Sequence, residues 1–277
     1  MWQHSAFVTS WSGRGPARPC LMKLKGRIAI VTGAGDGIGR GIALAFAREG
    51  ADVAVCALRR PNVEQTALKI EALGRRTTFG HFDASDEEAV INFVAEARKS
   101  LGPPSLLVTN ASTMPYGEAT DISVTEMDDC YRSKLKSSAL FVKHCIPHMR
   151  GVGDGSITMM ASVIGNTGFA RFAYYGAINA AIIGYARGLA IELAPYGIRV
   201  NSVSPGAVDA PMLHRFETQL GGDAAKLRAA IDANQPRGRI ATVEDVVASF
   251  VFLAGPEAAN ITACDLRCDG GVSFKGG

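Results

Sequence analysis

Short apolar runs alternate with longer stretches of mixed polarity along most of the chain. Runs of strand length predict seven strands, at residues 28–31, 53–56, 77–82, 106–108, 156–160, 198–203 and 265–267. Helices are expected between them, at residues 39–48, 63–73, 87–100, 125–148, 173–193 and 243–253. Repeated strand–helix units of this length predict an α/β fold: a doubly wound parallel sheet of about seven strands with helices on both faces.

The units follow one another without a linker or internal repeat, so residues 23–277 are expected to form a single domain. Residues 1–22 contain no acidic residue and lack both a clear amphipathic period and a secretory apolar core. We interpret them as a disordered N-terminal extension or the product of an upstream start codon; an organelle-targeting leader is the alternative. Residues 221–239 are the least regular part of the domain.

Composition narrows the class of protein. The chain of 277 residues is 47% hydrophobic and 20% charged, which is ordinary for a globular protein, and its net charge of +3 lacks the basic run that nucleic-acid binding would need. No unbroken apolar stretch approaches the ~20 residues of a membrane span. The six cysteines are scattered, which favours reduced, buried thiols and a cytoplasmic location.

A glycine-rich turn directly follows the first expected strand. It reads Thr32-Gly33-Ala34-Gly35-Asp36-Gly37-Ile38-Gly39 and opens the first helix. Glycines allow positive φ and let backbone N–H groups approach a phosphate closely. The helix N-terminus adds unpaired amides and a positive dipole end. The placement predicts a pyrophosphate-containing cofactor, bound through Gly33, Gly35, Asp36, Gly37, Ile38 and Gly39.

Further landmarks follow in order, each after a strand or in a helix that follows one. They are Asp83, Asn110-Ala111, Ser162, Tyr175, Asn201, Pro205-Gly206 and Asp269-Gly270-Gly271. With the glycine motif, this order resembles the short-chain dehydrogenase/reductase family, from the first strand to the C-terminus. The resemblance implies a Rossmann-type fold and a nicotinamide cofactor, with Asp83 and Ala84 at the adenine, Asn110 and Ala111 along the ribose, and Pro205, Gly206 and Val208 at the nicotinamide.

The choice between the two nicotinamide cofactors depends on the end of the second strand. An acidic residue there would bind the ribose 2′-hydroxyl of NAD, but the chain has Ala57 followed by Leu58. Arg59 and Arg60 come next and suit a 2′-phosphate. Asp36 argues in the opposite direction, since relatives that prefer NADP often have a basic residue there. We expect NADP(H) rather than NAD(H).

The family resemblance also implies a catalytic Ser, Tyr, Lys and Asn. Ser162 and Tyr175 lie 13 residues apart, the usual family spacing, and are assigned to carbonyl positioning and acid/base catalysis; Tyr174 is the backup. The Lys expected four residues after the tyrosine is Asn179, and Lys134 stands where the family has its Asn. Our hypothesis is a compensating exchange: Lys134 lowers the pKa of Tyr175, while Asn179 binds a water or the ribose.

The expected function is NAD(P)(H)-dependent reduction of a ketone, or oxidation of a secondary alcohol. Apolar residues expected around the pocket favour an apolar or aromatic substrate. These pocket residues are Met114, Tyr116, Val163, Ile164, Met212, Leu213 and Phe216, with Asn166 and His214 as polar neighbours, and residues 210–220 are expected to be flexible. The family resemblance also implies a homotetramer or a homodimer.

Three departures from the family pattern suggest a divergent site: Ser112, Ala210 and Ala263. Two alternatives therefore stay open, a non-redox dehydratase or isomerase with Lys134 as the base, and an inactive nucleotide-binding scaffold. His144 and His148 share the spacing of metal ligands, but no third ligand is apparent and we expect no metal.

Overall fold

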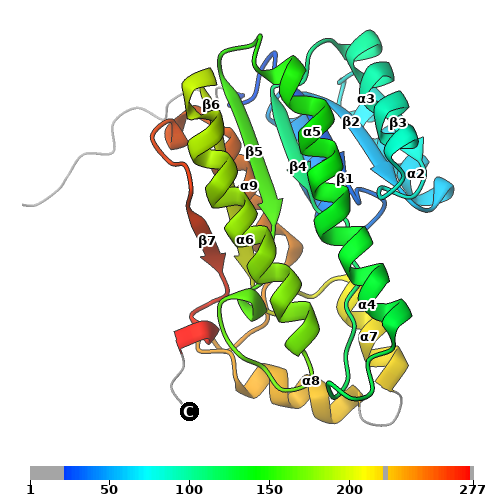
Figure 1. Ribbon diagram of the computed structural model, residues 1–277, viewed down its shortest axis with the longest axis vertical. Helices are drawn as coiled ribbons and strands as arrows, with labels where there is room; N and C mark the ends of the chain where they lie inside the picture. Colours follow the sequence, from blue (N-terminus) through cyan, green and yellow to red (C-terminus); the bar gives the residue numbers. More distant parts are fainter. Residues whose placement is uncertain (1–21, 221–223, 275–277) are drawn as a thin grey trace, which may run out of the picture.

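The described residues of the computed structural model, 22–220 and 224–274, form one seven-stranded sheet (Figure 1). Residues 1–21 of the expected N-terminal extension lie outside the described residues. Each expected strand is present, with ends shifted by at most two residues. The strands are β1 (Ile28–Thr32), β2 (Asp52–Ala57), β3 (Thr77–His81), β4 (Leu106–Thr109), β5 (Gly155–Met160), β6 (Ile198–Pro205) and β7 (Asp265–Cys268).

All neighbouring strands run parallel, in the order β3-β2-β1-β4-β5-β6-β7. The chain leaves β1 toward one side of the sheet and returns through β4 on the other, so the order reverses beside β1. In sheets of this kind ligands bind outside the carboxyl ends of the strands at that switch point. The topology therefore places a ligand site next to the glycine-rich turn that follows β1.

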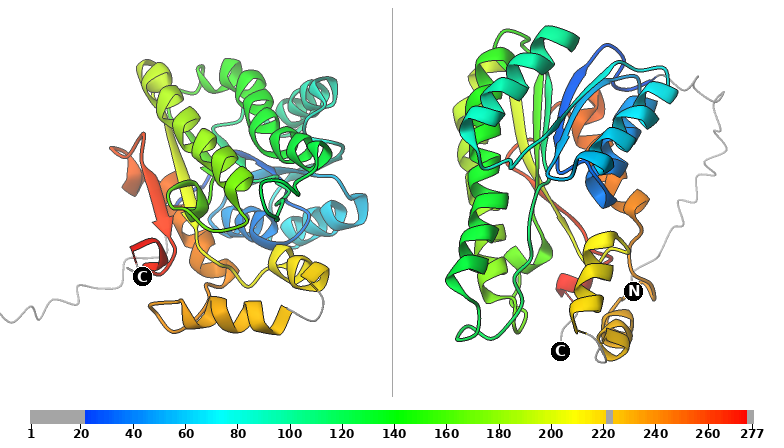
Figure 2. Two further views of the ribbon diagram at one scale, coloured as in Figure 1. Left: turned by 60° about the horizontal axis from the view of Figure 1, so that its bottom comes forward. Right: turned by 90° about the vertical axis from the view of Figure 1, so that its right-hand side faces the viewer.

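Helices cover both faces of the sheet, which the right-hand view of Figure 2 shows almost edge on. The sheet is buried from both sides, as its continuous apolar strands require. One face carries α1 (Gly37–Arg48), α2 (Arg60–Ala72) and α9 (Val243–Ala254); the other carries α3 (Glu87–Leu101), α5 (Ser137–Met149) and α6 (Ala173–Leu193).

Alternating side chains of the strands supply the two cores. On β1, Val31 packs with α1 and α9 around the fully buried Phe46 and Phe250, whereas Ile30 packs on the opposite face with α3, α5 and α6 around Phe141. Each core holds its helices at a fixed distance from the carboxyl edge of the sheet. The functional side chains on α6 and on the helix that precedes α5 are thus carried by rigid elements.

The helix expected at residues 125–148 consists of three segments. These are α4 (Val124–Cys130), the π-helical η1 (Tyr131–Lys136) and α5, which ends at Met149, one residue past the expected end. A π-turn adds one residue to a turn, so it rotates the residues that follow by about 100° relative to a regular helix. Lys134 lies inside this segment and is buried.

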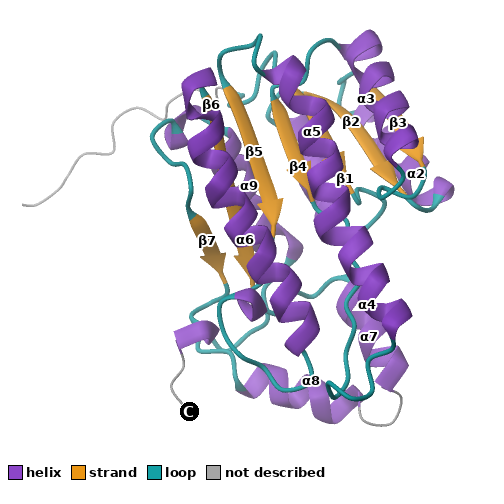
Figure 3. Cartoon of the chain, viewed as in Figure 1, coloured by secondary structure: helices purple, strands orange, loops and turns teal. Residues whose placement is uncertain are grey.

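Residues 210–239 are more regular than the sequence indicates. The stretch expected to be flexible forms α7 (Pro211–Leu220), and the region expected to be least regular contains α8 (Ala224–Ala233). Both helices lie beyond the carboxyl ends of the strands (Figure 3). Met212, Phe216 and Leu220 are spaced i, i+4, i+8 in the sequence, a helical period that the expectation of a flexible stretch overlooked, and Phe216 packs against the rings of Tyr116 and Phe172.

By length and composition alone α6 is apolar enough to cross a membrane, but ten of its residues are buried in the fold. Among the described cysteines, all free, Cys56, Cys130 and Cys145 are buried as expected, but Cys264 is exposed because it lies just before the edge strand β7.

Candidate active site

The carboxyl edge of the sheet brings together the residues that the sequence singles out. Ser162 follows β5, Tyr175 and Asn179 lie in the first two turns of α6, and Lys134 lies in η1, which contacts α6. Tyr175 belongs to a small buried cluster with Cys130 and Ile178. Segments that are far apart in the sequence thus converge on one tyrosine.

The glycine turn forms a narrow cradle beside β4. Gly33 has φ +63°, and a Cβ there would come within 2.9 Å of the Ala111 backbone. A Cβ on Gly39 would collide with the carbonyl oxygen of Gly33. No side chain of the described residues caps the first turn of α1, so its amides are available to a pyrophosphate. The cradle fits the phosphate part of a dinucleotide.

Asn110 and Ala111 hold this turn in place. The Asn110 amide donates to the Gly33 carbonyl at 3.1 Å, and the backbone N–H groups of Asn110 and Ala111 donate to the Thr32 hydroxyl at 3.0 and 3.3 Å. Asn110 therefore has a structural role between β1 and β4 in addition to the expected place along the ribose.

The expected adenine and nicotinamide residues lie at the same edge. The Asp83 carboxylate accepts from the Ser85 amide at 2.8 Å and from Arg132 at 3.1 Å, and Ala84 packs against the core. Past Pro205, the last residue of β6, Gly206 lies against the Asp269 backbone and Val208 forms an isolated bridge to Ala241. Arg132, which the sequence analysis overlooked, adds a cation beside Asp83.

Two basic residues and one ion-paired acid bear on the expected cofactor preference. Arg59 is the exposed N-cap residue of α2, and Arg60 begins that helix and pairs with Glu64 at 3.7 Å. Asp36, the acid that argued against NADP, pairs with Arg215 of α7 at 3.1 Å. Arg215 therefore offsets the negative charge that Asp36 would present to a 2′-phosphate.

Ser162 begins a short 3₁₀ turn, η2 (Val163–Gly165), that lies flat on α6. The Ser162 hydroxyl accepts from the Ile164 amide at 3.3 Å. A Cβ on Gly165 would come within 2.8 Å of the Ala180 backbone nitrogen, and one on Gly176 within 2.9 Å of the Ile164 carbonyl. Glycine at these two positions lets η2 and α6 approach closely enough to hold Ser162 beside the tyrosine helix.

Tyr175 is 6% exposed, and burial raises the pKa of its phenol to about 12, while the neighbouring Asn179 and Ser112 side chains act in the opposite direction. Ser112 stands where the family has glycine, so this departure adds a hydroxyl group near the tyrosine. The phenol is protonated at neutral pH in this form of the protein. It is therefore a proton donor.

Asn179 is fully buried and leaves one of its polar atoms unpaired. Its amide nitrogen donates to the Tyr175 carbonyl at 2.8 Å, but within the described ranges its Oδ1 has no hydrogen-bond partner. A buried acceptor without a donor is costly and points to a ligand or water that supplies one. A ribose hydroxyl or a water molecule would satisfy it.

Lys134 is 2% exposed, and its ammonium lies 5.8 Å from the centroid of the Tyr175 ring. Burial lowers its pKa to about 8, against which the nearby Cys130 acts weakly. In the part of the chain that the structure describes, no carboxylate forms an ion pair with it. The amine is thus buried near the Tyr175 ring, but the pKa of Tyr175 is raised and not lowered as the exchange hypothesis expects, and Lys134 is not among the causes of that shift.

Three aromatic rings close the approach to Tyr175. The Tyr116 ring lies 4.9 Å from that of Phe172 and 4.7 Å from that of Phe216, and Phe172 lies 6.4 Å from Tyr175. Tyr116 comes from the loop after β4, Phe172 from the loop before α6, and Phe216 from the helix α7. Sequence reasoning found Tyr116 and Phe216 but missed Phe172, which no periodic pattern marks.

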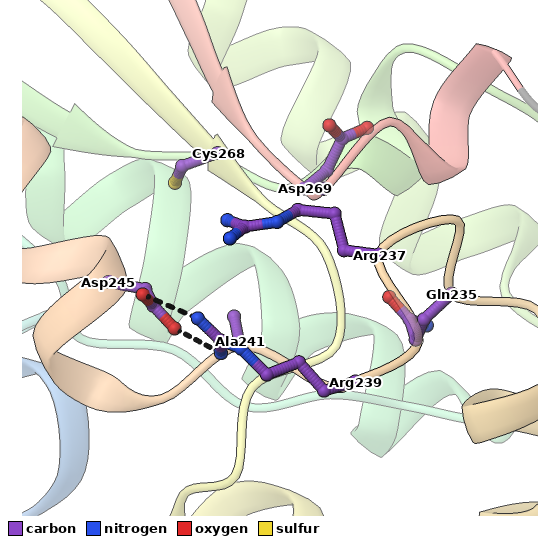
Figure 4. Close-up of a pocket in the computed structure, with 8 residues that line it drawn as sticks. Gln235, Arg237, Arg239, Ala241, Asp245, Cys268 and Asp269 are labelled. Atoms are coloured by element: carbon purple, nitrogen blue, oxygen red, sulfur yellow. Dashed lines mark hydrogen bonds and ion pairs between the residues drawn. The ribbon is translucent and has the colours of Figure 1, made fainter.

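A separate cavity of about 150 Å³ lies beside the end of β7 (Figure 4). Arg239 there binds Asp245 through two hydrogen bonds of 2.6 and 3.0 Å, and the Asp269 carboxylate accepts from the Gly271 and Ser273 amides. The Arg237 side chain points into the cavity between Cys268 and Asp245. Both acids that line this cavity, Asp245 and Asp269, are therefore already paired.

His144, one member of the histidine pair, is engaged by an acid. It binds the Glu87 carboxylate at 2.9 Å, as Lys143 does at 2.7 Å, and Glu87 thereby joins α3 to α5. Over the residues with described placement, no group of three potential metal ligands is found.

Comparison with known proteins agrees with this geometry. The family model described as enoyl-(acyl carrier protein) reductase matches residues 33–273. A short-chain dehydrogenase/reductase of Armillaria gallica is 35% identical over 90% of this chain and 97% of its own length. Cis-4-hydroxycyclohexanecarboxylate dehydrogenase of Sinomonas cyclohexanicum is 32% identical over 89% and 96%.

A solved structure gives the same result. L-sorbose reductase of Gluconobacter frateurii, in complex with NADPH and L-sorbose, superposes with a TM-score of 0.86 at 26% identity, covering 92% of this chain and 99% of that one. The chain therefore belongs to the short-chain dehydrogenase/reductase family of NAD(P)-dependent oxidoreductases.

Replacing Lys134 by Met should stabilise the protein at pH 7, by on the order of 2 kcal/mol in the free energy of unfolding, because Met removes an unpaired buried charge. The folded-state pKa of about 8 lies below the ordinary 10.5. Between these values the unfolded chain binds more protons, so the wild type gains stability as pH rises and the difference shrinks. Urea titrations from pH 7 to 10.5 measure this.

The exposed Lys25→Met variant is the control and should show no such pH dependence. A Lys134→Met protein less stable than the wild type at pH 7, or a difference that is constant with pH, would contradict the burial of a chargeable amine.

Proposed function

We propose that the protein is an NADP(H)-linked carbonyl reductase or alcohol dehydrogenase acting on an apolar or aromatic ketone or secondary alcohol. The observation that carries the proposal is the burial of Lys134 against the Tyr175 ring. It returns a lysine amine to the neighbourhood of the tyrosine, although the lysine expected on α6 is Asn179. A buried amine without an ion-pair partner destabilises the fold, and an inactive scaffold gives no reason to keep it. The burial of Lys134 therefore favours an enzyme over an inactive nucleotide-binding scaffold.

A bound nicotinamide supplies or accepts the hydride. The Ser162 hydroxyl, now accepting from the Ile164 amide, is free to donate to a substrate carbonyl oxygen. Tyr175, protonated at neutral pH, gives its proton to the oxygen that becomes the alcohol. In the oxidative direction the same two residues act in reverse, with Tyr175 accepting the proton.

Lys134 supports Tyr175 through its charge. Proton donation leaves a phenolate in a buried site, where the ammonium stabilises it far more than it would in water. The ammonium, whose pKa is lowered to about 8, then gives a proton to the phenolate, and the resulting neutral amine takes up a proton from water. Asn179 is left to hold a ribose hydroxyl or a water molecule through its unpaired Oδ1.

The cofactor preference rests on charge. Arg59 and Arg60 are exposed where β2 leads into α2, and Arg215 offsets Asp36. Guanidinium groups bind phosphate with paired hydrogen bonds, so this edge favours a 2′-phosphate. The relative solved with NADPH is consistent with that choice.

The substrate class rests on the aromatic rings. Tyr116, Phe172 and Phe216 present apolar faces and edges at the approach to Tyr175. Such rings favour a flat apolar ligand over a densely hydroxylated one. One relative acts on a cyclohexane carboxylate and one neighbour on a sugar, so the family itself does not fix the class.

A homotetramer or homodimer through α6 is part of the proposal. The small residues Ala177, Gly184 and Gly188 are exposed along one face of this helix, beside Ile191, which is 74% exposed. A Cβ built on Gly184 or Gly188 meets no atom within 4 Å, so the two glycines leave room for another helix to approach.

A second candidate is favoured by the lowered pKa of Lys134. A buried amine that loses its proton near pH 8 can act as a base in dehydration or isomerisation on the same fold. Such a reaction would convert substrate without net consumption of NADPH, which separates it from the first candidate.

Purified protein should consume NADPH with apolar and aromatic ketones, and Tyr175→Phe should lower kcat by ~10³-fold because it removes the proton donor. Tyr174→Phe, its neighbour on α6, should retain turnover. NADPH oxidation measured by absorbance checks this. Turnover that survives Tyr175→Phe would contradict the assignment, and conversion without NADPH loss would favour the second candidate.

Replacing both Arg59 and Arg60 by Ala should raise the Kd of NADPH by ~10-fold and change that of NADH less than ~2-fold, since only the former carries the 2′-phosphate. Fluorescence titration measures both constants without a substrate. Arg48→Ala, exposed at the far end of α1, is the matched control. An equal loss for both cofactors would show that the two arginines do not read the phosphate.

A further inference from the structure

A carboxylate at the start of β7 ties the segment that carries Ser162 to the sheet. Asp265 Oδ1 accepts from the hydroxyl groups of Ser202 and Ser204 at 2.6 and 2.8 Å. Its Oδ2 accepts from the side-chain amide of Asn166 at 2.8 Å. Both serines are buried on β6, and Asn166 is the residue that ends η2. One carboxylate thereby links three separate segments.

The same segment is already held from the opposite side. Gly165 lies against the α6 backbone next to Asn179, so close that a Cβ would collide. Inside the segment, the amides of Gly165, Asn166 and Thr167 donate to the carbonyls of Ser162 and Val163 at 2.9 to 3.0 Å. Residues 162–167 are therefore clamped between α6 and the β6–β7 edge.

Asn166 also donates to the Ser204 hydroxyl at 3.2 Å, and the Ala161 amide donates to the Val203 carbonyl just before Ser162. Asp265 accepts from both Asn166 and Ser204, so it is the one charged group in this tie between η2 and β6. Weakening the tie would let η2 shift along α6, and Ser162 would move with it relative to Tyr175. Displacements of about 1 Å at a reacting group lower rates by ~10²-fold, and a charge-assisted hydrogen bond in a partly buried network is suited to preventing such a shift.

We propose that Asp265 is a positioning residue, which fixes the Ser162 segment through Asn166. For its effect on catalysis the inference rests on the proposed function; for the anchoring itself it does not. Ser202 and Ser204 bind Oδ1 of Asp265, whereas Asn166 binds Oδ2. Substitutions can therefore change the hydrogen bond to Asn166 and leave an oxygen for the two serines.

The test is an exchange of the two side chains. Asp265→Asn keeps an oxygen for the serines but sets an NH₂ donor against the Asn166 NH₂. Asn166→Ala removes the link from the other side, on a half-buried turn. The double variant Asp265→Asn, Asn166→Asp rebuilds one donor–acceptor pair with the roles reversed. Asp129→Asn, an exposed carboxylate on α4, is the control.

Hydrogen exchange of residues 162–168 is the first readout. Both single variants should exchange the amides of Gly165, Asn166 and Thr167 at least ~10-fold faster, and the double variant should return to within about 3-fold of the wild type. Unchanged exchange in the singles, or no recovery in the double, would overturn the proposal.

Steady-state kinetics with a ketone is the second readout. The singles should lower kcat by ~10- to 100-fold with the Kd of NADPH unchanged, and the double should recover it. Faster exchange with an unchanged kcat would overturn the positioning role. Hydrogen exchange needs no substrate, so it tests the anchoring by Asp265 even if the protein is inactive. A wild type that is inactive toward all ketones would contradict the proposed function but not the anchoring.

Discussion

The burial of the Lys134 amine 5.8 Å from the centroid of the Tyr175 ring is the interaction on which the proposed site depends. An amine without a carboxylate partner loses hydration when it is buried, and its pKa falls to about 8 for that reason. The fold accepts this cost at one position, in a π-helical segment beside the tyrosine. Unpaired buried charge and irregular helix geometry both concentrate at functional sites, and here they coincide.

The surrounding structure serves to hold this pair. The parallel sheet places Ser162 and the glycine turn at one edge, and the two cores fix α6 and α5 relative to it. Close glycine contacts press η2 against α6, and Asp265 holds it from the sheet. The rings of Tyr116, Phe172 and Phe216 pack together, and Phe172 places this aromatic cluster beside Tyr175.

Most of the fold follows from local sequence. Apolar runs placed every strand to within two residues, because the central strands are short and buried along their length. The helices α7 and α8 were not predicted, and Phe216 of α7 packs against rings from loops distant in the sequence. The π-turn at Lys134 was also missed, because no residue type marks it. Asp265 was not recognisable as an anchor, since its partners lie more than 60 positions away.

The central claim is that a lysine lost from one helix is replaced by one on another. The most direct test is a cycle of four proteins assayed for ketone reduction: wild type, Lys134→Asn, Asn179→Lys and the double variant, which restores the family arrangement. We predict that Lys134→Asn loses ~10²-fold or more in kcat and that the double variant recovers most of it. Full activity in Lys134→Asn, or a double variant as inactive as that single one, would contradict the account.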